Sequence, residues 1–333
     1  MRSDLGKQGD FYPWFHEHVK PFADGSHLGS LDKEIFGQMQ KLFKGEDGAR
    51  AVDSWARIAE SAENLAKRWS EGFAERLEES LQPHLEEITG VGTDLQLISP
   101  RPWAIPTGDR REAVVLSITQ QVNDIVARAV GLHSDRFAGI AALPQAAGTD
   151  AKFCVDELER CVSELGFVGL KINPDPTEGA GETPHMGDEY WYPLYEKMVA
   201  LDVPALLHGG PFRFSREPEL GYFPGEEAVA AWSILRTPRV FEDFPALKIV
   251  VGHGGGYIPY QAGRGRAFRL NAMRNDPSLE SFDDSMRRLY YDTVLYDQDA
   301  MDLLVKVVGV DHCLFGSDKP ANGSVHDPAT GRA

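Results

Sequence analysis

The chain has 333 residues, 42% of them hydrophobic and 26% charged, which is enough to bury the core of one large domain or of two smaller ones. Its net charge of −17 argues against non-specific binding to nucleic acid or to anionic membranes, although a local cluster of basic groups and metal can still hold an anionic substrate. No apolar run is long enough to span a membrane, the first residues lack the apolar core of a signal peptide, and the 3 cysteines do not form a disulfide framework. We therefore expect a cytoplasmic protein with no nucleic-acid or membrane partner.

The N-terminal part lacks the regular pattern of the rest of the chain. Residues 1–50 show no clear periodicity, whereas Trp55, Ile58, Ala62 and Leu65 begin an apolar stripe of helical spacing that continues to about residue 88. Pro83 is expected to interrupt this helix. Residues 1–90 are therefore predicted to form an N-terminal segment with a helical insertion or a cap.

From residue 91 onward, short apolar runs alternate with amphipathic segments. Strands are expected at residues 94–99, 137–143, 167–173, 203–208, 247–253, 288–294 and 312–318. Helices are expected at residues 111–130, 151–165, 190–202, 225–237, 258–273 and 297–309. This alternation is typical of a parallel sheet, and it favours an α/β (β/α)8 TIM barrel over residues 91–333 whose first strand is uncertain. A doubly wound open sheet is the alternative.

Three of the expected strands end on polar residues that can carry chemistry. The run LKIVVGHGGGYIPY stops being apolar at His253, VPALLH ends at His208, and HCLFGSD ends at Asp318. Because active sites of α/β barrels lie at the carboxyl ends of the strands, these side chains are expected to share one site. The glycines after His253 are expected to let the backbone turn tightly and approach a bound ligand.

Five blocks, in order, carry a family resemblance. They are LERCVSELGFVGLKINPDP, WYPLYEKMVALDVPALLH, FEDFPALKIVVGHGGGYIPYQAGR, LYYDTVLYD and VVGVDHCLFGSDKP. Together they resemble the amidohydrolase-related family of metal-dependent TIM barrels, which includes aminocarboxymuconate-semialdehyde and resorcylate-type decarboxylases. The middle blocks are most similar to 4-oxalomesaconate hydratase. The resemblance covers roughly residues 90–320.

The resemblance implies one divalent metal, zinc or alternatively manganese, and no organic cofactor. It makes His208 and Asp318 metal ligands, and it makes His253 and Asp318 the catalytic acid/base residues. Two further ligands come from a first-strand HxH pair, for which the chain offers only His16-Glu17-His18. Pro13 and the aromatic run before that pair make a poor central strand, so an exposed turn is the rival interpretation. The sequence is also expected to be incomplete at one or both ends.

Several residues are candidates for binding a small carboxylic-acid substrate. Lys171 and Asn173 lie two residues apart at the end of one strand and so share a face. Arginines can grip a carboxylate through paired hydrogen bonds, and the candidates are Arg101, Arg213 and Arg264. A homodimer is the expected assembly, as the resemblance implies.

The reaction expected first is non-oxidative decarboxylation of a small aromatic or unsaturated acid. Family decarboxylases and hydrolases carry Asp in the GS[DE] block, as this chain does at Asp318, whereas hydratases of the 4-oxalomesaconate type carry Glu. Hydration of a conjugated C=C bond and hydrolysis remain alternatives. A further alternative is a non-catalytic relative that has lost the HxH pair.

Overall fold

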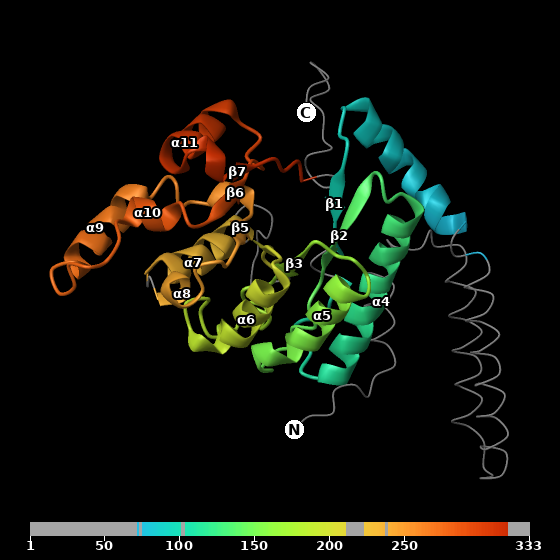
Figure 1. Ribbon diagram of the computed structural model, residues 1–333, viewed down its shortest axis with the longest axis horizontal. Helices are drawn as coiled ribbons and strands as arrows, with labels where there is room; N and C mark the ends of the chain where they lie inside the picture. Colours follow the sequence, from blue (N-terminus) through green and yellow to red (C-terminus); the bar gives the residue numbers. More distant parts are fainter. Residues whose placement is uncertain (1–71, 73–74, 101–103, 211–222, 237–238, 319–333) are drawn as a thin grey trace, which may run out of the picture. The chain divides into compact units, whose positions relative to one another are not determined.

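The computed structural model describes residues 72, 75–100, 104–210, 223–236 and 239–318 (Figure 1). The chain divides into two compact units, residues 1–86 and 87–333. Residues 75–90 are helical through Pro83, so the interruption expected there is wrong. In a helix the N–H of residue 83 would bond the carbonyl of Glu79, but a proline has no N–H. Pro83 and Glu79 are both exposed, so water can bond that carbonyl instead. The domain boundary near residue 90 remains a prediction.

Seven parallel strands form one sheet in the order of the chain. They are β1 (Gln96–Ile98), β2 (Phe137–Ala141), β3 (Gly169–Ile172), β4 (Ala205–Leu207), β5 (Ile249–Val251), β6 (Tyr290–Asp292) and β7 (Cys313–Leu314). Consecutive strands are neighbours throughout, whereas a doubly wound sheet reverses direction at a switch point. The order is therefore that of a barrel wall. The described residues contain seven strands, so the expected eighth strand and the closure of the barrel remain predictions.

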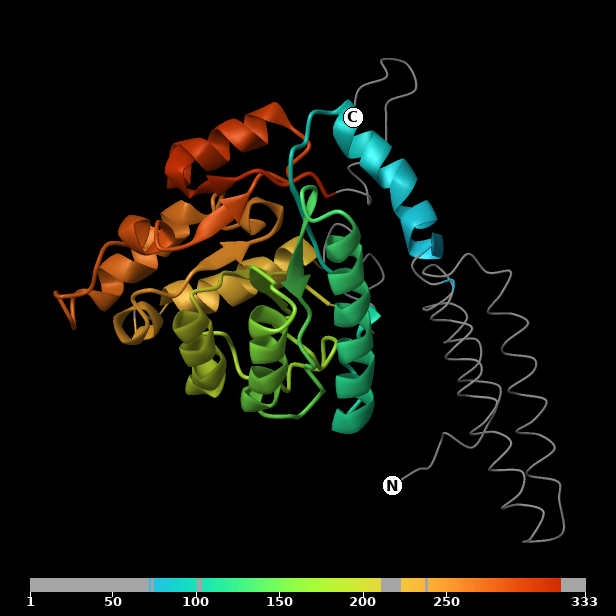
Figure 2. The ribbon, with the colours of Figure 1, turned by 45° about the vertical axis from the view of Figure 1, so that its right-hand side comes forward.

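The strands alternate with helices close to the expected positions. The longer helices are α4 (Glu112–Leu132), α5 (Val155–Ser163), α6 (Tyr192–Leu201), α7 (Phe223–Arg236), α9 (Ala262–Ala272) and α11 (Gln298–Val308). Two short helices, α8 (Arg239–Asp243) and α10 (Phe282–Met286), were not expected. The helices lie around the outside of the curled sheet (Figures 1 and 2). Among the described helices, none has the length and apolar character needed to cross a membrane.

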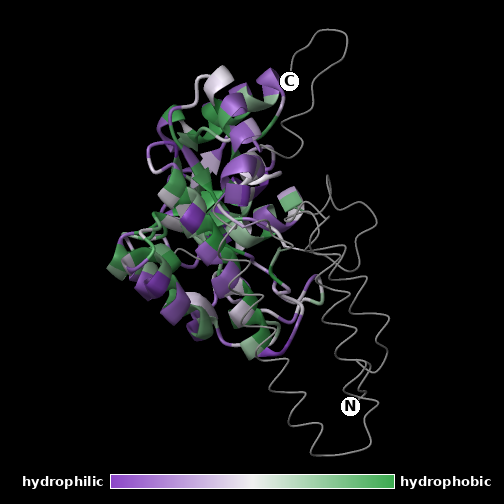
Figure 3. Cartoon of the chain, turned by 90° about the vertical axis from the view of Figure 1, so that its right-hand side faces the viewer, coloured by the Kyte–Doolittle hydropathy of each residue, from purple (hydrophilic) through white to green (hydrophobic). Residues whose placement is uncertain are grey.

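The two faces of the sheet differ in burial, and this difference positions the site. Side chains that face the helices are sealed from solvent: Ile172, Leu207 and Val251 are 0% exposed, in matching register on adjacent strands. Lys171 and Leu206, one residue earlier in the same register, point to the inner face and are only partly buried. Figure 3 shows the hydrophobic residues gathered along the strands and the polar ones on the surrounding helices. Polar groups at the strand ends can therefore gather only on the inner face.

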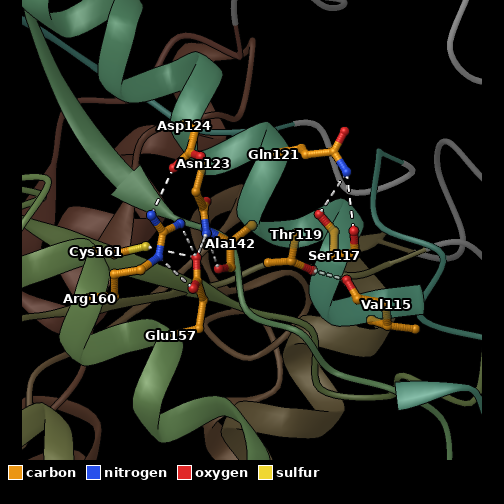
Figure 4. Close-up of polar contacts among 10 residues, drawn as sticks. All are labelled: Val115, Ser117, Thr119, Gln121, Asn123, Asp124, Ala142, Glu157, Arg160 and Cys161. Atoms are coloured by element: carbon orange, nitrogen blue, oxygen red, sulfur yellow. Dashed lines mark hydrogen bonds and ion pairs between the residues drawn. The ribbon is translucent and has the colours of Figure 1, made fainter. Parts of the chain in front are cut away.

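A buried polar network ties α4 to α5 and to the chain after β2 (Figure 4). The Asn123 side chain exchanges hydrogen bonds of 2.9 and 3.0 Å with the Ala142 backbone and donates one of 2.8 Å to Glu157. Arg160 donates two further bonds of 2.8 Å to Glu157. Burial by itself raises the pKa of Glu157, but the bonds from Arg160 and Asn123 outweigh it and lower that pKa overall. The carboxylate is thus charged and fully satisfied in the core.

Replacing Asn123 by Ala is expected to destabilise the fold by about 2–3 kcal/mol, because it removes the side-chain partner of both Ala142 backbone groups and one of the donors to the buried Glu157 carboxylate. Gln121→Ala is the matched control on the same helix, since Gln121 is exposed and bonds only Ser117 (Figure 4). It should change stability by less than about 0.5 kcal/mol. Urea unfolding followed by circular dichroism measures both. Equal effects of the two variants would contradict the role given to the network.

Candidate active site

Polar side chains gather at the carboxyl edge of β3 to β6. Asn173 and His208 directly follow β3 and β4, and Asp292 is the last residue of β6. His253 opens a short 3-10 turn, His253–Gly255, after β5. By the alternation of side chains along a strand, Asn173 and His208 lie on the inner face with Lys171. The sheet therefore brings together the two histidines that the sequence singled out.

His208 is held in its neutral form. Its Nδ1 lies 2.8 Å from the carbonyl oxygen of Gly209, and because a carbonyl only accepts, Nδ1 carries the proton and Nε2 presents a lone pair. Burial, followed by the charges of Lys171 and His253, lowers the pKa of His208 to about 3. A neutral imidazole with a fixed tautomer is the form that binds a metal ion or accepts a proton.

His253 lies beside His208 but has the opposite electrostatic setting. The two ring centroids are 5.6 Å apart, and the ring of Phe223 packs against both histidines. The Nδ1 of His253 is 2.7 Å from Oε2 of Glu227, a carboxylate with 0% exposure. The other oxygen, Oε1, accepts the Gly209 N–H at 3.1 Å and lies 3.9 Å from Nδ1 of His208. Glu227 on α7 thus contacts both strand ends.

The pKa of His253 is set by this carboxylate. Burial lowers the pKa, but the hydrogen bond and charge of Glu227, with the charges of Asp292 and Asp318, outweigh burial and raise it. Burial raises the pKa of Glu227 and of Asp292, partly offset for each by His253. The site therefore holds one neutral histidine and one with a stronger tendency to be protonated, an arrangement suited to proton transfer.

The glycines after His253 have a different role from the one expected. A Cβ at Gly256 would lie 2.1 Å from the Pro224 carbonyl oxygen, and one at Gly254 would lie 2.6 Å from the Leu295 side chain. Both glycines also have positive φ. They are needed for a tight turn and for close packing, because protein atoms fill the space where a Cβ would lie, and the expected approach of this backbone to a ligand remains a prediction.

A small cavity of about 20 Å³ lies beside His208, on the side of β2 and β3. Its polar lining comes from Thr107, Gln145, Lys171, Asn173 and His208. Gln145 bonds both backbone groups of Asn173, at 2.7 and 2.8 Å, and so fixes the chain where β3 ends. The volume corresponds to about one water molecule.

Lys171 is the cationic group of this cavity. Its Nζ donates a hydrogen bond to the Pro100 carbonyl, and burial lowers its pKa to about 7. Lys171 and Asn173 thus lie where the sequence predicted a substrate contact, next to His208. Their role in substrate binding remains a prediction.

Asp318 follows β7 and belongs to the same edge. Its Oδ2 accepts a hydrogen bond of 2.6 Å from the Tyr296 hydroxyl, and its charge contributes to the raised pKa of His253. Within the described residues, however, no three His, Cys, Asp or Glu side chains converge as a metal-binding group. The neutral ring of His208 fits a metal ligand, and His16 and His18, the further ligands expected from the sequence, lie outside the described residues.

Among the described residues, no candidate arginine lines this cavity. Arg264 is exposed on α9 and lines a separate surface groove with Trp232 and Phe268. Arg101 and Arg213 lie outside the described residues. A substrate contact by any of the three stays a prediction.

Sequence reasoning missed Glu227, although a signal was present. Glu227, Ala231 and Ile234 recur at helical spacing on the side of α7 that is 0% exposed, so a carboxylate occupies an otherwise apolar stripe. A buried acid in such a position needs a partner, and here that partner is His253. Asp292 was overlooked although it ends a strand, as His208 does.

Comparison with known proteins identifies relatives along most of the chain. A family model described as amidohydrolase matches residues 52–333. A 2-keto-4-carboxy-3-hexenedioate hydratase from Sphingobium is 35% identical over 287 residues, covering 85% of this chain and 83% of the relative. A gamma-resorcylate decarboxylase from Rhizobium is 32% identical over 248 residues, covering 70% of this chain and 73% of the relative. The lyase expected from the sequence agrees with these relatives, which include both reaction types.

Solved structures give the same result. The crystal structure of a 4-oxalomesaconate hydratase from Rhodopseudomonas palustris matches with a TM-score of 0.68 and 32% identity, covering 81% of each chain. A dihydroxybenzoic acid decarboxylase from Polaromonas, with bound manganese and the inhibitor 2-nitroresorcinol, matches with a TM-score of 0.61 and 26% identity, covering 72% of this chain and 75% of the other. The family model spans most of the chain and the resemblance in the five blocks points the same way, so this protein belongs to the amidohydrolase family.

Proposed function

We propose that the protein is a metal-dependent lyase that removes CO2 from a small aromatic or unsaturated carboxylic acid. The observation that carries this proposal is the pair of histidines whose rings lie 5.6 Å apart at the strand ends, one neutral and one with a raised pKa. Decarboxylation needs an acid that delivers a proton to carbon and groups that hold the substrate's oxygens. Relatives that carry out this reaction support the assignment.

A divalent metal would be held by His208 and Asp318, together with His16 and His18. Zinc is the first choice and manganese the alternative, which is supported by the manganese in the Polaromonas decarboxylase. The metal would act as a Lewis acid that polarises a substrate oxygen. The neutral ring of His208 supports its place in this ligand set.

The chain's own residues would move the proton. His253 donates it from Nε2 to the ring or alkene carbon that bears the carboxylate, while Glu227 balances the positive charge of the imidazolium. The bond from that carbon to the carboxylate then breaks, its electron pair returns to the π-system, and CO2 leaves. Lys171 and Asn173 would orient the substrate through its oxygens. His253 regains its proton from solvent.

Water addition to a conjugated C=C bond is the second candidate. The observation that favours it is the match to the Sphingobium hydratase, which covers more of both chains than the match to the Rhizobium decarboxylase. The same edge would serve, with His253 giving a proton to one carbon while Asp318 takes one from the incoming water. Aspartate at position 318, where the resemblance implies glutamate for such hydratases, places decarboxylation first.

The two reactions are separated by their products. The metal-loaded protein is incubated with 2,6-dihydroxybenzoate and, separately, with 4-oxalomesaconate, while CO2 release and loss of the conjugated absorbance are followed. Decarboxylation predicts CO2 in amounts equal to the substrate consumed. Loss of absorbance without CO2 would assign the protein as a hydratase and overturn the first choice.

Metal binding is predicted to depend on His208. The purified chain should hold about one divalent ion, and His208→Ala should lower the content at least tenfold, because a neutral imidazole ligand is lost. His133→Ala is the control and should keep the ion, because His133 follows the C-terminal end of α4, contacts Phe137 and does not line the cavity. Elemental analysis of the three proteins gives the result. Less than about 0.3 ion per wild-type chain, unaffected by His208→Ala, would favour a non-catalytic relative.

The pH dependence is predicted to respond to Glu227. The protonated form of His253 is active and its pKa is raised, so activity should fall as pH rises through that raised value. Glu227→Gln removes the charge that holds the proton, so this basic limb should move to lower pH by about one unit, and kcat should fall about 10- to 100-fold. A kcat/KM profile from pH 5 to 10 measures the shift. A loss of activity with an unmoved basic limb would show that Glu227 is only structural.

A further inference from the structure

The turn after β5 has a backbone conformation that is unusual for one of its residues. His253, Gly254, Gly255 and Gly256 all have positive φ, of 48°, 61°, 78° and 57°. Glycine adopts such values without steric cost, so the last three residues are expected to do so. His253 has a Cβ, and such a residue stays in this left-handed region only where its surroundings hold it there. The contacts around His253 therefore decide where its ring lies.

The first fixed point of His253 is its side chain. The Nδ1 atom is 2.7 Å from Oε2 of Glu227, so α7 holds one nitrogen of the ring. Two side-chain torsions separate the ring from Cα, so this contact alone allows more than one combination of backbone and ring orientation. A second contact, on the main chain, is required to give Nε2 a single position.

Asp292 supplies that contact on the main chain. Its Oδ1 accepts the Gly254 N–H at 2.8 Å and the Val294 N–H at 3.2 Å. One oxygen thus joins the turn after β5 to the chain after β6. These two strands are parallel neighbours, with Val251 opposite Tyr291 (Figure 1). The left-handed turn is therefore tied to the end of the next strand.

The Asp292 side chain lies on the inner face of the sheet. Tyr291, the residue before it, is 0% exposed and donates its hydroxyl to the Met286 carbonyl on α10, so Tyr291 faces the helices. Successive side chains of a strand point to opposite faces, so Asp292 lies on the face that holds the histidines. A Cβ at Gly316 would lie 3.1 Å from the Asp292 Cβ, so the chain after β7 packs against Asp292. Asp292 itself therefore has little freedom to move.

We propose that Asp292 is a positioning residue for His253, because it holds the left-handed turn through the Gly254 N–H while Glu227 holds the ring. The two contacts come from different elements and act on the main chain and the side chain of the same turn, so together they leave Nε2 one position. The inference rests on the proposed function in that His253 is the proton donor. A misplacement of about 1 Å can cost about 100-fold in rate, so a group that never touches the substrate can control kcat.

Other roles for Asp292 predict different results when its side chain is removed. A residue that binds the substrate would raise KM, and a metal ligand would lower the metal content. A residue that only supports the fold would lower stability without changing kcat of the folded protein. A positioning residue instead lowers kcat while KM and metal content stay the same.

Steady-state kinetics of the metal-loaded full chain separate these roles, with 2,6-dihydroxybenzoate and 4-oxalomesaconate as substrates. Each variant is measured on the acidic plateau of its own pH profile, so that a change in the pKa of His253 does not contribute. Asp292→Ala should lower kcat at least about 30-fold and change KM less than about threefold. Asp292→Asn keeps an oxygen that can accept the Gly254 N–H, so its kcat should lie within about fivefold of the wild-type value.

Asp276→Ala is the matched control. Asp276 also accepts a backbone N–H, that of Ser278 at 3.0 Å, but it lies between α9 and α10. Figure 1 shows these helices at the outer end of the sheet, away from the carboxyl ends of β5 and β6. Its removal costs a turn contact of the same kind, so kcat of this variant should equal that of the wild type.

Hydrogen exchange at the turn gives a readout that does not depend on activity. In Asp292→Ala, the amides of residues 252–258 should exchange at least about tenfold faster than in the wild type, whereas Asp292→Asn should stay close to the wild type and α4 should be unchanged in both. If the wild-type protein consumes neither acid, the proposed function fails, and faster exchange in Asp292→Ala still supports the anchoring of the turn.

The proposal is overturned if Asp292→Ala keeps wild-type kcat, loses the metal or acts only through a raised KM. It is also overturned if Asp292→Asn or Asp276→Ala loses as much kcat as Asp292→Ala, or if exchange at the turn is the same in Asp292→Ala and the wild type.

Discussion

The buried carboxylate of Glu227 links two strand ends at the carboxyl edge of the sheet. Glu227 is 0% exposed, so its two oxygens need donors from the protein, and they receive them from His253 and from the Gly209 backbone. These donors follow neighbouring strands, and Gly252 must be a glycine because a Cβ there would lie 2.9 Å from the carboxylate. The orientation of His253 and the turn after His208 therefore depend on one side chain of α7.

This arrangement gives His208 and His253 opposite shifts in pKa. His208 bonds a backbone carbonyl beside the Lys171 ammonium and stays neutral, whereas His253 bonds a carboxylate and favours its protonated form. Groups whose environments drive their pKa values apart divide acid and base roles between them. Decarboxylation and hydration both require a proton delivered to carbon beside a held anion. The same edge thus suits both reactions found among the relatives, and the loops that contact the substrate decide between them.

The sequence was most informative where structure follows from local pattern. Alternating apolar runs located the seven strands, and polar residues at strand ends led to His208, His253 and Asn173 on one edge. Glu227 could not be found by that rule, because it reaches the site from a helix and its buried position depends on tertiary packing. The close packing of the glycines after His253 could not be predicted for a related reason: the atoms that a Cβ would meet there come from Pro224 and Leu295, which are distant in sequence. The helix continues through Pro83, where the exposed position leaves the Glu79 carbonyl accessible to solvent.

The central claim is the metal centre proposed at this edge, for which His208 and Asp318, with His16 and His18, are the proposed ligands. Diffraction from crystals grown with zinc, recorded on both sides of the zinc absorption edge, locates the ion directly. The account predicts one strong anomalous peak about 2.0–2.2 Å from Nε2 of His208, with His16 and His18 as further ligands. A peak remote from His208, or His16 and His18 lying away from a peak at His208, would contradict it.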